Sequence, residues 1–83
     1  MTQDNIVIYG ADWCSDCRRA KQFMEQRSIQ FDWIDVEVDE EARELVKNLN
    51  NGRRVIPTIV FQDGSVLVEP SNAALANKLG ITQ

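Results

Sequence analysis

Hydrophobic residues recur along the chain with two different spacings, one typical of strands and one typical of helices, and the two spacings alternate from segment to segment. Residues 5–9 form a short apolar, β-branched run closed by Gly10, which is typical of a buried strand. In residues 14–27 the apolar positions recur at three- and four-residue spacing between charged ones, which predicts an amphipathic helix. Residues 31–36 alternate roughly between apolar and polar, so we expect a second strand there.

The remaining chain continues this alternation of strands and helices. The further predicted elements are a helix over 39–50, strands over 58–62 and 65–69 joined by a turn at Asp63-Gly64, and a short helix that begins at 70–72 and ends at Gly80. The order β-α-β-α-β-β-α implies a parallel strand pair joined by a right-handed crossover, followed by an antiparallel hairpin. We therefore predict an α/β protein with the thioredoxin fold, in which a four-stranded mixed sheet carries helices on both faces.

Length and charge limit the classes of function that the chain can have. The 83 residues suffice for one domain, which we place at 1–83, and no segment reaches the roughly 18–20 apolar residues that cross a bilayer. A formal net charge of −4 argues against nucleic acid, whose phosphates need clusters of Lys and Arg. Seven of the thirteen acidic residues fall within 32–44, which we interpret as a solvated face. The polar N-terminus lacks a signal-peptide pattern, so we expect a cytoplasmic protein. We also expect a monomer.

The chain contains two cysteines and no histidine. The absence of histidine excludes His-based general catalysis and mixed Cys/His zinc sites. Two thiols are also too few for a four-cysteine metal site within one chain. The chemistry that remains is the chemistry that two sulfurs do together.

The segment Trp13-Cys14-Ser15-Asp16-Cys17 follows the first predicted strand and begins the first predicted helix. A C-x-x-C motif in that position predicts redox chemistry, because one helical turn places both sulfurs on the same face. Unpaired backbone N–H groups and the helix dipole stabilise negative charge at a helix N-terminus, so we expect the pKa of Cys14 to fall from about 8.5 toward roughly 7 or below. Cys14 is therefore the predicted attacking thiolate, and Cys17, one turn further and more buried, is the predicted resolving thiol.

Other interpretations of this segment stay open. The two cysteines could form a structural bridge, or they could hold a metal or iron–sulfur cluster shared between two chains. An interaction domain could also keep the fold without turnover. The carboxylate of Asp16 lies near both sulfurs and disfavours a thiolate, so we expect it to make the dithiol–disulfide couple of Cys14 and Cys17 more reducing. Its alternative role is only to stabilise the N-terminus of the helix.

A second motif, Val55-Ile56-Pro57-Thr58-Ile59, places a proline at the entrance of a predicted strand. The proline could simply mark the boundary, since it cannot donate to a ladder. In a thioredoxin fold it would instead be a cis-proline that faces the C-x-x-C. The backbone groups of Ile56 would then be available to pair with a bound peptide or thiol.

Together these segments resemble the glutaredoxin family. The stretches that carry the resemblance are 9–17, which contains the C-x-x-C, 55–58, which contains Ile-Pro-Thr, and 63–65 with 69–71. The resemblance spans residues 6–79 and is nearest to the mycoredoxins and the glutaredoxin-like hydrogen donors of ribonucleotide reductase. It implies an enzyme, a thiol–disulfide oxidoreductase that reduces protein disulfides or mixed disulfides between proteins and a low-molecular-weight thiol.

The resemblance also implies the residues of the site. The catalytic pair would be Cys14 and Cys17, and the substrate-binding positions would be Trp13, Arg53, Arg54, Ile56, Pro57, Ser71 and Asn72. The two arginines would grip an anionic group of the small thiol, or else be solvated surface side chains. Ser71 and Asn72 match the place where the family binds the glutamyl end of glutathione, and their alternative role is to cap the last helix.

Three positions depart from the pattern of glutathione-using members. Trp13 precedes the first cysteine as in thioredoxins, Ala11 stands where those members carry a lysine, and 69–72 replace a Gly-Gly-x-Asp segment. No bound cofactor is expected, and three electron sources stay open: glutathione, mycothiol or a thioredoxin-reductase-like flavoprotein. The expected partners are disulfide-containing proteins, with no nucleic acid and no membrane.

Overall fold

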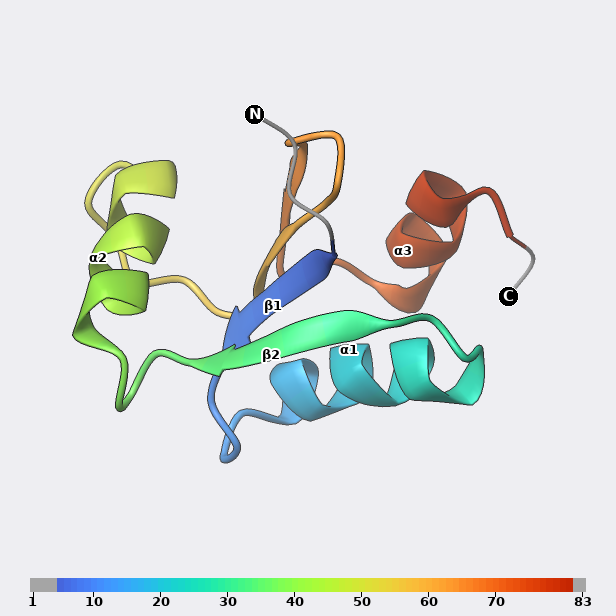
Figure 1. Cartoon of the computed structure of the whole chain (residues 1–83), viewed down its shortest axis with the longest axis horizontal. Coiled ribbons are helices and arrows are strands. Elements are labelled where there is room, and N and C mark those ends of the chain that lie inside the picture. Colours follow the sequence, from blue (N-terminus) through green and yellow to red (C-terminus); the bar gives the residue numbers. More distant parts are fainter. Residues whose placement is uncertain (1–4, 82–83) are drawn as a thin grey trace.

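A computed structural model describes residues 5–81 of the chain. Within that range the predicted order of elements is confirmed (Figure 1). The elements are β1 (Ile6–Gly10), α1 (Ser15–Gln26), β2 (Phe31–Asp35), α2 (Glu40–Leu49), β3 (Thr58–Val60), β4 (Val66–Val68) and α3 (Asn72–Leu79). No helix in this part of the chain is long and apolar enough to cross a membrane.

The strands form one mixed sheet in the order β2-β1-β3-β4. β1 runs parallel to β2, with Gly10 opposite Asp35, and antiparallel to β3, with Tyr9 opposite Thr58. β3 and β4 pair as an antiparallel hairpin. All five residues of β1 are buried, as expected for a strand with a neighbour on each side and helices on each face. The chain that leaves this central strand leads directly into the C-x-x-C segment.

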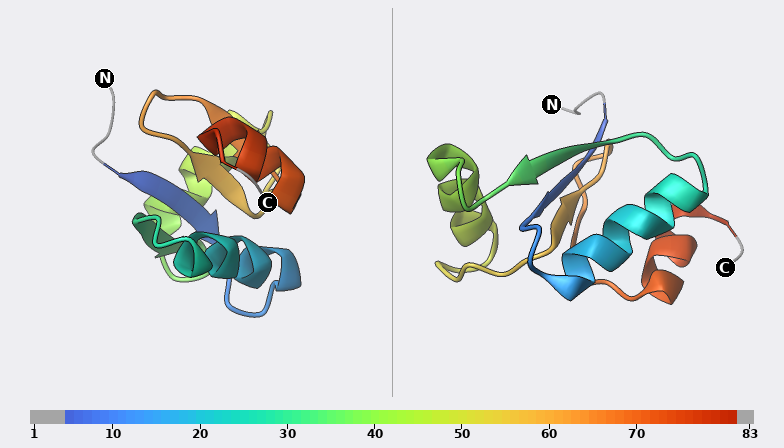
Figure 2. Two further views of the ribbon diagram at one scale, coloured as in Figure 1. Left: turned by 90° about the vertical axis from the view of Figure 1, so that its right-hand side faces the viewer. Right: turned by 90° about the horizontal axis from the view of Figure 1, so that it is seen from below.

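Helices cover both faces of the sheet, as predicted. Figure 2 shows α1 and α3 on one face and α2 on the other. Successive residues of β1 point to opposite faces, so the strand contributes to two separate cores. The core under α1 and α3 includes Ile6, Ile8, Phe23, Met24, Ile59 and Leu75. The core under α2 includes Val7, Tyr9, Val36, Ala42 and Val46.

The hairpin strands are shorter than the sequence pattern indicated. β3 ends at Val60 rather than residue 62, because the turn already begins at Phe61. The N–H of Phe61 donates to the carbonyl of Ser65 (2.8 Å), and its carbonyl accepts from Gly64 (2.9 Å). β4 ends at Val68 because Glu69 adopts a left-handed conformation with φ 49°. The predicted turn is therefore present but takes up more of the chain.

Helix ends follow the predicted capping signals. The carboxylate of Asp39 accepts the N–H of Ala42 (3.0 Å) and caps α2. Beyond its C-terminus, Asn51 and Gly52 both adopt positive φ, of 57° and 86°, which is the left-handed stop expected of them. This stop directs the chain back toward the sheet, where it forms one side of the site.

Candidate active site

Cys14 is the N-cap of α1 rather than its first helical residue. Its backbone is extended (φ −82°, ψ 118°), and its Sγ accepts a hydrogen bond from the backbone N–H of Cys17 (3.4 Å). The N–H of Cys14 in turn donates to the carbonyl of Ala11 (3.1 Å), which closes the loop between β1 and α1. The sulfur thus occupies the place of a capping side-chain oxygen, where the orphan N–H groups and the helix dipole favour negative charge.

Cys17 lies one turn further along α1 and is fully buried, whereas Cys14 is half-buried. Both are free thiols. The sulfur of Cys17 packs against the end of β1, where Gly10 leaves no side chain. A Cβ at Gly10 would lie 2.7 Å from Cys17 Sγ and 2.8 Å from Cη2 of Trp33, and both distances are shorter than real contacts allow. Gly10 is therefore required for space, a role that its sequence position at the end of a strand did not reveal.

The two thiols differ in electrostatic environment. The pKa of Cys17 is raised to about 12, first by burial and next by the hydrogen bond that links it to Cys14. A backbone hydrogen bond with Ala11 acts in the opposite direction, and the charge of Asp16 is among the smaller causes that raise the pKa. Cys17 therefore stays protonated near neutral pH, which suits a thiol that acts second.

An open groove of about 700 Å³ runs past Cys14. Of the residues that sequence analysis assigned to substrate binding, four line this groove together with Cys14: Trp13, Arg53, Arg54 and Ile56. They come from the loop before α1 and from the segment between α2 and β3, which are far apart in the sequence. The fold therefore brings the C-x-x-C and the Ile-Pro-Thr motif to the same groove.

The Ile56-Pro57 peptide bond is cis, and Pro57 is buried behind the groove. The carbonyl of Pro57 accepts the N–H of Glu69 (2.9 Å), and the hydroxyl of Thr58 donates to the carbonyl of Val55 (2.6 Å). Within residues 5–81, the backbone N–H and carbonyl of Ile56 make no hydrogen bond. Since Ile56 also lines the groove, its main chain is available to a bound molecule.

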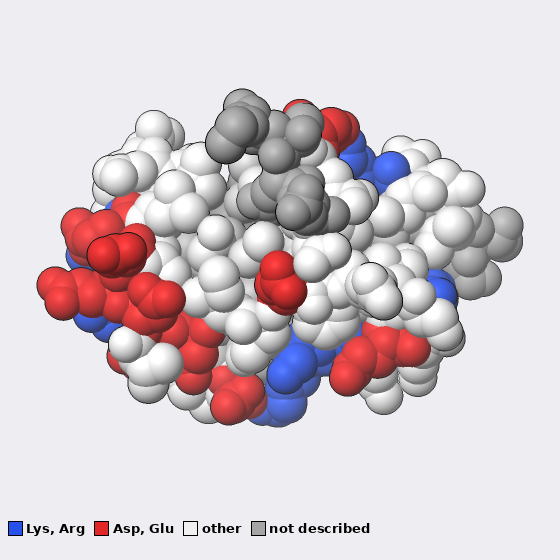
Figure 3. Space-filling model, in the orientation of Figure 1, with Lys and Arg blue, Asp and Glu red and all other residues white. Residues whose placement is uncertain are grey.

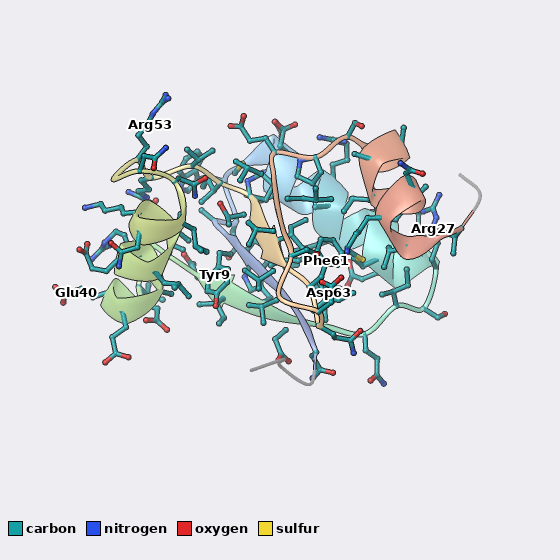
Figure 4. The ribbon with its side chains drawn as sticks, turned by 90° about the horizontal axis from the view of Figure 1, so that it is seen from above. Tyr9, Arg27, Glu40, Arg53, Phe61 and Asp63 are labelled. Carbon is teal, nitrogen blue, oxygen red and sulfur yellow. The ribbon has the colours of Figure 1, made fainter. Side chains whose placement is uncertain are left out.

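The two arginines of the groove differ in their contacts. Arg54 forms an ion pair with Glu37, whose carboxylate also accepts the indole N–H of Trp13 (3.2 Å). The side chain of Arg53 makes no ion pair with any residue in 5–81, and Figure 4 shows it pointing away from the protein. Sequence analysis missed Glu37, because it stands inside an acidic run that was interpreted as a solvated face.

Ser71 and Asn72 lie outside the residues that line the groove. The hydroxyl of Ser71 caps α3 by accepting the N–H of Ala74 (3.0 Å). The side-chain oxygen of Asn72 accepts from Arg19 (3.2 Å), which ties the start of α3 to α1. Both side chains therefore already have structural partners in the position where the sequence resemblance placed thiol binding.

Residues 5–81 contain no group of three or more His, Cys, Asp or Glu side chains that could hold a metal ion. Among the residues that line the groove, Cys14 carries the thiol, and the second thiol, Cys17, is buried one helical turn behind it.

Comparison with known proteins agrees with this geometry. The glutaredoxin family model matches residues 6–66. Mycoredoxin 1 of Corynebacterium glutamicum is 39% identical over 75 residues, which cover 90% of this chain and 92% of the relative. Among solved structures, a mutant of a thioredoxin-like protein matches with a TM-score of 0.84 and 25% identity, covering 96% of this chain and all of that one. A glutaredoxin from Archaeoglobus fulgidus matches with a TM-score of 0.73 and 19% identity, covering 95% of this chain and 87% of that chain.

A thioredoxin fold that presents two neighbouring cysteines at the start of its first helix defines a thiol–disulfide oxidoreductase. Within that class, the chain belongs to the glutaredoxin family.

Proposed function

We propose that the chain reduces mixed disulfides between proteins and a low-molecular-weight thiol, with Cys14 as the attacking thiolate and Cys17 as the resolving thiol. The observation that carries this assignment is the asymmetry of the pair. Cys14 is half-buried at the helix N-terminus and lines the groove, whereas Cys17 is fully buried behind it with a raised pKa. Only Cys14 is therefore open to the sulfur of an incoming disulfide.

The reaction has two exchange steps. The Cys14 thiolate attacks one sulfur of the substrate disulfide, a new bond forms between Cys14 and that sulfur, and the other substrate sulfur leaves as a thiolate. Cys17 then attacks the Sγ of Cys14, which releases the second substrate thiolate and leaves an internal disulfide. The proton lost by Cys17 compensates one leaving thiolate. The protein gives up two electrons, which an external thiol must return.

The environment of Cys17 orders these steps. Two causes of its raised pKa, the hydrogen bond with Cys14 and the charge on Cys14, depend on a free sulfur at position 14. Both weaken once that sulfur is neutral in a mixed disulfide, so the pKa of Cys17 falls. The resolving thiol thus becomes easier to ionise only after the substrate is attached.

Mycothiol is the small thiol that we assign as electron source. The 39% identical relative is named a mycoredoxin, which supports mycothiol over glutathione. The groove is consistent with this choice, because Arg54 is already paired with Glu37 and Ser71 and Asn72 have structural partners. Ile56 would hold the small thiol through its unpaired backbone groups, against the wall formed by Trp13.

A recycling assay tests the electron source. The oxidised protein is offered mycothiol, glutathione, or a thioredoxin reductase with NADPH, and the free thiols that appear per chain are counted. We expect mycothiol to restore the dithiol fastest. Restoration by the flavoprotein alone would contradict the small-thiol route, and restoration by none of the three would contradict the redox cycle itself.

Two single substitutions test the roles of the cysteines. Cys14→Ser is expected to abolish disulfide reduction. Cys17→Ser is expected to accumulate a mixed disulfide at Cys14, visible by intact mass as the added mass of the small thiol. The reverse pattern, with the adduct trapped at residue 17, would exchange the two roles. Measuring molar mass and visible absorbance of the purified protein also tests the metal-sharing alternative, which requires a coloured or metal-containing dimer.

A further inference from the structure

Glu37 connects the two walls of the active-site groove. It lies just after β2, in the connection to α2, and a single oxygen of its carboxylate contacts both sides. On one side it accepts the indole N–H of Trp13, next to the attacking cysteine (3.2 Å). On the other side it forms the ion pair with Arg54. Three segments that are distant in the sequence therefore meet at one carboxylate.

Hydrogen bonds hold the backbone of Glu37 in place. The backbone N–H of Glu37 donates to the carboxylate of Asp35 (2.8 Å). A guanidinium nitrogen of Arg43, on α2, donates to the carbonyls of Val36 (3.1 Å) and Glu37 (3.4 Å). Because the backbone of Glu37 is held on both sides of its Cα, binding of its side chain to Arg54 costs side-chain freedom but little backbone freedom. Figure 3 shows a cluster of acidic side chains over the α2 side of the protein and further ones elsewhere on the same face.

We propose that Glu37 is a specificity-determining residue, an internal carboxylate that occupies Arg54 and thereby disfavours substrate disulfides that carry carboxylates beside the sulfur. This inference rests on the proposed function, in which the disulfide binds in the groove next to Cys14. An anionic disulfide can bind Arg54 only by displacing Glu37 from the ion pair, whereas binding of an uncharged disulfide does not involve this ion pair.

The substitution Glu37→Gln separates charge from position. A glutamine at this site keeps an oxygen that can accept the indole N–H of Trp13, but it removes the negative charge that neutralises Arg54. The freed guanidinium then becomes a partner for a substrate carboxylate. The reactivity toward an uncharged disulfide should change little, because the wall formed by Trp13 is retained.

The test uses single-turnover kinetics of the fully reduced protein, which need no electron donor. The two probes are dithiodipropionate, which carries two carboxylates, and its uncharged diamide, which has the same carbon chain and the same disulfide. We expect the ratio of their second-order rate constants, anionic over neutral, to rise roughly two- to five-fold in Glu37→Gln, the range of a half-exposed ion pair. The rise should shrink with added salt.

Two further variants make the result specific. Glu41→Gln, on the exposed side of α2 and outside the groove, makes the same change in net charge and should leave the ratio unaltered. Adding Arg54→Gln to Glu37→Gln should return the ratio to the wild-type value. An unchanged ratio in Glu37→Gln, or an equal rise in Glu41→Gln, would overturn the inference while leaving the proposed function intact. Failure of the wild type to reduce either probe would instead overturn both.

Discussion

The buried position of Cys17 makes a quantitative prediction about alkaline stability. The pKa of Cys17 is raised from an ordinary 9.0 to about 12, chiefly by burial and then by the hydrogen bond with Cys14. Above about pH 9 the unfolded chain therefore releases a proton that the folded protein retains. Folding stability contributed by this group is fully present below pH 9 and is lost progressively as the pH rises toward 12.

The size of the loss follows from the shift. Each pH unit above the unfolded-state pKa lowers the free energy of unfolding by about 1.4 kcal/mol for one group. Raising the pH from about 8 to about 10 should therefore destabilise the reduced protein by about 1.4 kcal/mol through Cys17 alone. For a domain of this length that loss lowers Tm by about 6–11 °C.

Urea unfolding of the reduced protein at several pH values between 8 and 10 measures this loss, with Cys17→Ala as the matched control. Every other ionisable residue is common to both proteins, so the difference between the two pH slopes reports the contribution of Cys17. We expect the wild type to lose stability more steeply, and the oxidised wild type to lack the extra slope because its sulfurs no longer titrate. Parallel slopes for wild type and Cys17→Ala would refute the assignment of a raised pKa to this thiol.

Three further predictions concern the neighbourhood of the two sulfurs. Gly10→Ala should destabilise the protein by about 1–3 kcal/mol in urea unfolding, because the new methyl group overlaps Cys17 and Trp33; an unchanged midpoint would show that the space can open. Asp16→Asn should make the reduction potential less negative by roughly 10–30 mV in a redox titration, since it removes a charge that disfavours a thiolate; a shift to more negative values would contradict this. Cys14→Ser should raise the stability of the reduced protein by about 0.5–1 kcal/mol, because serine is a stronger N-cap than cysteine, and equal or lower stability would contradict it.

The elements that the sequence predicted well are those with strong local signals. The helix over 39–50 had an acidic cap, an apolar stripe and an Asn-Gly stop, and the observed α2 differs from it by one residue at each end. The hairpin was correct in kind but too long, because the positions of Phe61 and Glu69 depend on turn geometry that strand propensity does not describe. The cis geometry of the bond before Pro57 was expected only from the thioredoxin fold and is confirmed; the local residues alone could not predict it, since most X–Pro bonds are trans.

The candidate site was predictable where one short segment carries it. The C-x-x-C spacing and its place between a strand and a helix were sufficient to predict that both cysteines lie close together at the start of α1, because a single helical turn fixes their geometry. The walls of the groove were harder to assign, because they depend on which segments meet in space. Arg54 was predicted either to bind an anionic group of the small thiol or to be a solvated surface side chain; within the structure it pairs with Glu37, seventeen positions away. Nothing in the local sequence distinguishes Glu37 from the six other acids of the run 32–44.

The residues that depart from the usual preferences for helix caps and strand ends are the ones that position the two thiols. A helix that began with serine or aspartate would be better capped than α1, whose first N–H groups face a sulfur. A strand end with a side chain would pack more surface than β1, whose last residue is glycine because Cys17 Sγ fills that space. Each departure costs some stability, and each places one of the two thiols: Cys14 at the mouth of the groove, and Cys17 one turn behind it. The pair can exchange electrons because Cys14 and Cys17 lie one turn apart at the start of α1, directly after the buried central strand that ends at Gly10.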